Sequence, residues 1–213
     1  IKLTTHERDL GNASVRTWEY HANGPVIAEG GVMKKSLLPL TETAILIALA
    51  TVLELIFKQL AFLEMPQGGK VSIATLPILI VGYRHGWKYG FAAGVSFAIL
   101  NFMIDGFYWH WGSIFFDYIF AFGLLGVTGF FTKGRKNIFI FVLGIVVAGF
   151  LRYIMSSLSG VLFFGEYAAD AGYADAVWFY SFIVYNLGYN LLSTIACAVC
   201  GSLLWPFIIK ENN

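Results

Sequence analysis

Six apolar stretches, long enough or nearly long enough to cross a bilayer as helices, restrict the fold of this chain most strongly. A spanning helix needs about 20 predominantly apolar residues. Of all residues, 58% are hydrophobic and 13% are charged, whereas soluble domains carry about 25% charged residues. We therefore predict an all-α membrane protein, a bundle of six transmembrane helices. The expected helices cover residues 37–60, 72–83, 88–104, 113–131, 138–164 and 177–209.

The first 32 residues differ in character from the rest. They are polar, mixed in charge and without a hydrophobic period, so they offer no apolar face for packing and no signal-peptide core. We expect residues 1–32 to be a disordered extension, or not native, with Met33 as the natural start. The predicted membrane domain is then 33–213.

The distribution of basic residues predicts the orientation in the membrane. Short cytoplasmic loops carry an excess of lysine and arginine. Acids dominate the loops at 105–113 and 165–176, so we place both of these loops, and the loop at 61–71, outside the cell. Both termini are then cytoplasmic. The basic residues on the predicted inner side are Lys34, Lys35, Arg84, Lys88, Lys133, Arg135, Lys136 and Lys210.

Several function classes lack support in the sequence. The net charge of +1 leaves no basic footprint for nucleic acid. There is no GxxxxGK[ST] for ATP hydrolysis, no HExxH and no GxSxG. Cys197 and Cys200 form a CxxC inside an apolar run, which we interpret as two buried small side chains and not as a metal site. We therefore expect no catalytic residue, no metal and no cofactor.

The candidate site combines three segments. The stretch FYWHWGSIFFDY, residues 107–118, brings Trp109, His110, Asp117 and Tyr118 together near the outer side. Residues spaced three or four apart share one helix face, and two later helices each carry such a polar face. If these faces converge, they form an outward pocket suited to a flat, cationic, hydrogen-bonding ligand, because rings attract cations and buried acids balance them. The two faces comprise Arg152, Ser156, Ser159, Gly160 and Phe164, and Asn186, Tyr189, Asn190, Ser193 and Thr194.

Each of these residues has a simpler interpretation. Trp109 can belong to an interfacial aromatic belt, and His110 can be an ordinary exposed histidine. Arg152 can pair with Asp117 as a structural strut. The serines of the 138–164 helix can serve close helix packing, as Gly90 and Gly94 do in the GxxxG of the third helix.

Several dispersed motifs resemble one family. His110-Trp-Gly-Ser-Ile-Phe-Phe-Asp117-Tyr118 keeps the His-to-Asp spacing of a family pattern, and Tyr185-Asn-Leu-Gly-Tyr189 matches another. From Met33 onward the chain resembles the thiamine-specific substrate-binding (S) components of energy-coupling factor transporters, the ThiT family. Further matches are Pro66-Gln-Gly-Gly-Lys-Val-Ser72 and Ser159-Gly-Val-Leu-Phe-Phe-Gly-Glu-Tyr-Ala168.

The resemblance implies thiamine as the ligand, bound from outside. It places Asp117 beside the thiazolium, with Tyr118 next to it, and Asn186 at the aminopyrimidine. Arg152 takes the place of a basic residue of the fifth helix. Further implied contacts are Gly160, which leaves room for a ring, Phe164, which stacks on the ligand, and Tyr189. Two implied site residues depart from the family pattern: Ser156 stands where a histidine is common, and Tyr180 lies one residue further from Asn186 than the usual tyrosine.

The resemblance also implies partners. Ala44 and Ala48 form the AxxxA spacing by which S components dock on a transmembrane coupling subunit, although such spacing also serves packing within a bundle. Two cytosolic ATPases would supply the energy. The chain is then a multi-pass protein of the bacterial plasma membrane, surrounded by lipid, that captures thiamine for ATP-dependent uptake. The alternatives are an S component for another vitamin or a pyrimidine precursor, a membrane enzyme using His110, Asp117 and Arg152, and a small channel.

Overall fold

The computed structural model describes residues 25–60, 64–65, 69–131 and 137–210. The chain divides into two units, residues 1–41 and Glu42–Asn213, and the second contains the helical bundle. Helix α2, Pro25–Lys58, runs through the boundary between them. Residues 1–24 of the expected extension and the basic loop 132–136 lie outside the described residues, and so do the side chains of Lys34, Lys35 and Lys210.

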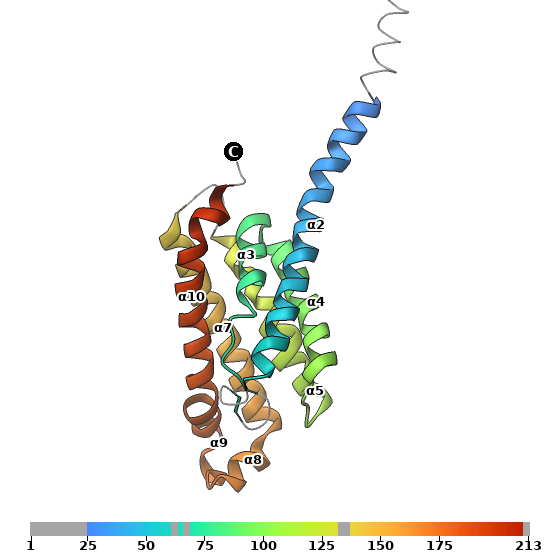
Figure 1. Cartoon of the computed structure of the whole chain (residues 1–213). Coiled ribbons are helices and arrows are strands. Elements are labelled where there is room, and N and C mark those ends of the chain that lie inside the picture. The colour runs from blue at the N-terminus through green and yellow to red at the C-terminus, as the bar shows by residue number, and fades with distance from the viewer. Residues whose placement is uncertain (1–24, 61–63, 66–68, 132–136, 211–213) are drawn as a thin grey trace, which may run out of the picture. The chain divides into compact units, whose positions relative to one another are not determined.

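The bundle is all-helical in its described part (Figure 1). Within the second unit, the ends of α7 and α10 near α8 and α9 lie at one end of the bundle, and the C-terminal end of α10 lies at the other (Figure 1). The elements after α2 are α3 (Leu76–His85), α4 (Trp87–Asp105), α5 (Trp111–Ile114), η3 (Phe115–Phe120), α6 (Ala121–Gly123), η4 (Leu124–Phe130), α7 (Ile138–Phe163), α8 (Gly165–Asp170), η5 (Ala174–Ala176), α9 (Val177–Phe179), η6 (Tyr180–Asn186) and α10 (Leu187–Lys210).

Four helical stretches of the described chain are long and apolar enough to cross a membrane: Leu37–Lys58, Trp111–Phe130, Ile138–Phe163 and Ala174–Ile209. The predicted helices 37–60, 113–131, 138–164 and 177–209 correspond to them. The other two correspond to α3 and α4. Helix α3 has 10 residues and is about 15 Å long, so six complete spans remain a prediction.

The start of α3 differs from the expected start at residue 72. The helix begins at Leu76, and Pro77 lies in its first turn. Proline is favoured at this position because its missing N–H would have no partner within the helix in any case. Residues 69–75 are non-helical, and Gly69, Lys70, Ser72 and Thr75 among them line the cavity described below.

The bundle is held by an apolar core and by close glycine contacts. Phe97, Ile78 and Phe141 are fully buried. Helix α4 packs on α3 and η4, and a Cβ added at Gly90 would lie 2.6 Å from the Gly82 Cα, and one added at Gly94 2.1 Å from a backbone oxygen. The GxxxG of α4 is thus a packing face, as predicted.

The distribution of polarity is that of a membrane protein. Large apolar side chains such as Met103, Phe139 and Leu203 are exposed, whereas Glu54 and Asn186 are buried. Apolar groups facing outward are favourable in lipid, and polar groups inside the bundle usually mark a function.

Candidate functional site

A cavity of about 1000 Å³, counting the space open to solvent at its mouth, lies within the Glu42–Asn213 unit. Its wall is formed by segments far apart in the sequence, from α2 to α10. Of the residues predicted for the ligand site, the lining includes Asp117, Tyr118, Arg152, Ser156, Gly160, Phe164, Tyr180, Asn186 and Tyr189. The sequence did not single out Glu54, Gly69, Lys70, Ser72, Thr75, Asn101, Phe107, Phe122, Tyr167, Ser181 and Tyr185, which also line it.

Asp117 is one of the two acids that line the cavity, with Glu54. Its Oδ2 accepts a hydrogen bond of 2.6 Å from Ser159 Oγ, so α7 holds the carboxylate of η3. The guanidinium of Arg152 lies 4.6 Å from the centre of the Phe122 ring. Among the described residues no ion pair within 4 Å joins Arg152 to Asp117, which argues against the strut interpretation. The carboxylate is positioned by a neutral donor and can balance a positive ligand.

Aromatic rings line two sides of the cavity. On one side the Phe107 ring lies 6.1 Å from that of Phe164 and 6.4 Å from that of Tyr167, between centroids. On the other, Tyr185 lies 6.2 Å from Tyr180 and 6.0 Å from Tyr189. Ring faces attract cations by about 0.5–2 kcal/mol each, so this wall suits a flat or positively charged group.

Both the nitrogen and the oxygen of the Asn186 side-chain amide form hydrogen bonds within the cavity wall. Its Nδ2 donates to the Ser181 carbonyl at 3.0 Å and to Ser181 Oγ at 3.3 Å, while its Oδ1 accepts from the Tyr189 hydroxyl at 2.6 Å. Ser181 Oγ in turn donates to the Ser157 carbonyl at 2.7 Å. The network fixes the side chain, so a ligand that bonds Asn186 must share or replace one of these partners.

Both π-helical segments of the described chain contribute to the cavity. Phe115–Phe120 carries Asp117 and Tyr118, and Tyr180–Asn186 carries Tyr180 and Asn186 at its two ends. A π-helical turn interrupts the regular i→i+4 bonding and is frequent at functional sites. Apolar periodicity carries no signal for such turns, so the sequence predicted plain helices there.

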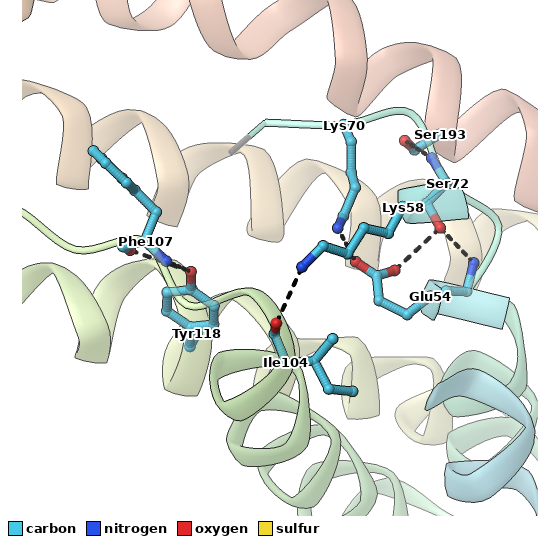
Figure 2. Close-up of polar contacts among 9 residues, drawn as sticks. Glu54, Lys58, Lys70, Ser72, Ile104, Phe107, Tyr118 and Ser193 are labelled. Atoms are coloured by element: carbon cyan, nitrogen blue, oxygen red, sulfur yellow. Dashed lines mark hydrogen bonds and ion pairs between the residues drawn. The ribbon is translucent and has the colours of Figure 1, made fainter. Parts of the chain in front are cut away.

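Glu54, Lys70, Ser72 and Ser193 form a polar cluster that the sequence pattern does not predict (Figure 2). The first three of these residues line the cavity. Lys70 Nζ lies 2.9 Å from Glu54 Oε1. Ser72 Oγ donates to Glu54 Oε2 at 3.3 Å, and Ser72 N donates to Ser193 Oγ at 3.1 Å. An acid in an apolar helix is the available signal for Glu54, but Lys58 lies four residues further on, a spacing that favours a local pair on a helix. Lys58 Nζ instead donates to the Ile104 carbonyl at 3.1 Å.

Not every predicted residue lines the cavity. Ser159, Asn190, Ser193 and Thr194 of the two polar faces do not, and neither do Trp109 and His110. Trp109 is 53% exposed and packs its edge on Tyr167 at 5.4 Å. The His110 ring accepts from Gly112 N at 3.1 Å and stacks on Phe163 at 5.1 Å, so it caps α5. Trp109 thus contacts a residue that lines the cavity, Tyr167, and His110 contacts Phe163. Direct ligand contact by either residue stays a prediction.

The two cysteines were predicted to be buried, and only one of them is. Both are free thiols, Cys197 buried and Cys200 partly buried. No cluster of three or more His, Cys, Asp or Glu side chains suitable for a metal ion occurs in the part of the chain that the structure describes.

Fold and cavity together define a helical membrane protein with an internal, polar and aromatic cavity of a size suited to one small solute. Residues 40–212 match the family model described as thiamine transporter protein. This chain therefore belongs to the thiamine transporter family.

Relatives with that description cover most of the chain. A protein named thiamine transporter ThiT from Bacillus subtilis is 36% identical over 194 residues, 84% of this chain and 97% of its own length. One of the same name from Lacticaseibacillus paracasei is 29% identical over 201 residues, 84% of this chain and 94% of its own. The solved structure of ThiT from Listeria monocytogenes has a TM-score of 0.69 at 23% identity, covering 81% of this chain and 96% of that one. This last likeness concerns the fold.

Proposed function

We propose that this chain is the thiamine-binding S component of an energy-coupling factor transporter. The observation that carries the proposal is that Asp117 and Asn186 line the same cavity as three tyrosines, Tyr180, Tyr185 and Tyr189. Thiamine joins a positively charged thiazolium to a hydrogen-bonding aminopyrimidine, and the cavity offers a partner for each part. Membership of the thiamine transporter family and two relatives named thiamine transporter ThiT support the same ligand.

The two halves of thiamine have different requirements. The thiazolium needs a negative charge and ring faces. Asp117 provides the charge, and Phe107 and Phe164 provide the rings. The aminopyrimidine needs paired donors and acceptors, which Asn186 provides once it exchanges a protein partner for the ligand. Ser156, buried on α7, offers one more hydroxyl. The chain binds and carries its ligand and changes no covalent bond in it.

The proposed orientation places the cavity toward the outside of the cell. Gly69, Lys70, Phe107 and Tyr167 line it, and they belong to the three loops, 61–71, 105–113 and 165–176, that the basic residues predict to be external. Six spans with both termini in the cytoplasm agree with this arrangement. Thiamine would then enter from outside and leave toward the cytoplasm when the partner subunits act.

The energy would come from a coupling subunit and two cytosolic ATPases. Ala44 and Ala48 are exposed on α2, although many large apolar side chains of the bundle are exposed too. Small residues one turn apart permit close approach of a second helix. We therefore propose this face of α2 as the docking site for the coupling subunit.

Titration of the purified chain in detergent tests the ligand. We expect tight 1:1 binding of thiamine and weaker binding of hydroxymethylpyrimidine, its neutral pyrimidine half. Mass spectrometry of small molecules that co-purify with the protein gives an independent answer. Absent or merely micromolar thiamine binding would overturn the proposal, and a preference for the pyrimidine half would assign the chain to a precursor instead.

A further inference from the structure

Glu54 and Lys70 form a buried ion pair in the wall of the cavity. Their side chains are only 6% and 9% exposed, and Nζ and Oε1 lie 2.9 Å apart. Figure 2 shows Lys70 approaching the Glu54 carboxylate on one side and Ser72 on the other. A buried pair with this geometry compensates its own charges, and removing one partner leaves the other uncompensated.

The formal charges of the lining residues sum to zero. Two acids, Glu54 and Asp117, face two bases, Lys70 and Arg152. A ligand with one positive charge raises the sum to +1 in a region surrounded by lipid-facing helices. Uncompensated charge inside a membrane protein is costly, so a cationic ligand binds well only if one resident positive charge leaves or a negative one enters.

Lys70 is the base that can leave. It lies in the non-helical segment 69–75, and a lysine carries its charge on a flexible four-carbon stem. Arg152 lies in the middle of α7, with its guanidinium over the Phe122 ring. Arg152 is thus held on a packed helix and against a ring, whereas Lys70 lies outside the helices, where its side chain and backbone can move with less disturbance of the packing.

We propose that Lys70 is a resident cation, which neutralises Glu54 in the empty cavity and turns away from it when a cationic ligand enters. The positive charge of the ligand replaces that of Lys70 in the balance of the cavity. Glu54 and Lys70 then set the preference for a cationic over a neutral ligand. This inference rests on the proposed function, because it takes thiamine as the cation.

Replacement of Lys70 by methionine tests the charge exchange. Lys70→Met leaves Glu54 without its counter-charge, so thiamine no longer competes with a resident cation. We expect thiamine to bind about tenfold more tightly, the change that corresponds to one modest ion-pair energy, while hydroxymethylpyrimidine binds as to the unmodified chain. Lys58→Met is the matched control, because Lys58 is also a lysine beside Glu54 but does not line the cavity. It should change neither affinity.

Chemical labelling tests the movement without any substitution. The unmodified protein is treated briefly with an amine-reactive ester, with and without saturating thiamine, and the labelled lysines are measured by mass spectrometry. We expect labelling of Lys70 to rise severalfold with thiamine. Exposed Lys88 serves as the internal reference and should not change.

The outcomes separate this inference from the proposed function. Thiamine binding with unchanged or reduced labelling of Lys70 would overturn the inference and leave the function standing. So would equal effects of Lys70→Met on thiamine and on the neutral fragment, or a thiamine affinity that rises with chloride at constant ionic strength, which would assign the compensation to an anion. Failure of the unmodified chain to bind thiamine would overturn both.

Discussion

Ser159 Oγ on α7 donates a 2.6 Å hydrogen bond to Oδ2 of Asp117 in η3. This bond joins two spanning helices at the cavity and keeps one carboxylate oxygen occupied. The second oxygen remains for a ligand. This geometry supports the proposed role of Asp117 in charge recognition, since the neighbouring Arg152 lies over a ring and forms no ion pair with it in the described part of the chain.

Asp117→Asn is expected to weaken thiamine binding by about 10- to 100-fold, because a charge-assisted contact contributes about 1.5–3 kcal/mol. The neutral hydroxymethylpyrimidine should lose much less affinity. Isothermal titration with both ligands measures the difference. Asp170→Asn, which removes an exposed acid of α8, is the control. Equal losses for both ligands would indicate damage to the fold and would contradict a charge role.

Gly160→Ala is expected to disrupt the Asn186 network. An added Cβ would lie 2.1 Å from Ser181 Oγ, and the displaced hydroxyl would lose its bond to the Ser157 carbonyl. Thiamine affinity and thermal stability should both fall, and Ser181→Gly in the same chain should restore part of each. Gly188→Ala, where the added Cβ meets nothing within 4 Å, should be neutral. No recovery in the double variant would place the effect of Gly160 elsewhere.

Tyr189→Phe removes the 2.6 Å bond to Asn186 Oδ1 and leaves a buried acceptor without this donor. We expect the free energy of unfolding to fall by about 1–3 kcal/mol, measured by thermal unfolding in detergent. Affinity for hydroxymethylpyrimidine should change as well, since the amide of Asn186 is reoriented. Tyr153→Phe loses a bond to the Phe182 carbonyl away from the cavity lining. It should lower stability and leave affinity unchanged, so a matching affinity loss there would argue against a specific role of Tyr189.

Ala44→Trp and Ala48→Trp are expected to abolish thiamine uptake by whole cells while binding by the purified chain survives. A large ring on this face of α2 prevents close approach of a partner helix. Ala92→Trp on α4, also at an exposed alanine, provides the comparison and should transport normally. Normal uptake in both α2 variants would place the docking face on another helix.

The helices were predictable because lipid imposes long apolar segments, and the polar faces of α7 and η6–α10 were predictable from their spacing. Ser156 and Gly160 line the cavity on one face of α7, and Asn186 and Tyr189 do so on the last helix. Spacing on a helix restricts which side chains share a surface, so these predictions of position needed no tertiary information.

The α2 side of the cavity was not predictable in the same way. The segment carrying Lys70 and Ser72 is non-helical, and its contacts to Glu54 and Ser193 join residues 16 to 121 positions apart. Local pattern favours the nearer lysine, Lys58, for Glu54. Only the folded backbone decides which of two lysines reaches the carboxylate.

The π-helical turn at Tyr180–Asn186 is a place where the chain can accommodate the one additional residue between Tyr180 and Asn186 that the family resemblance implies. Bonding from i to i+5 takes up an inserted residue within a widened turn. An insertion taken up in this way would leave the register of the following 24-residue helix unchanged and would displace Tyr180 relative to Asn186. Length variation at this place can thus reshape the cavity among related chains while the scaffold around it stays the same.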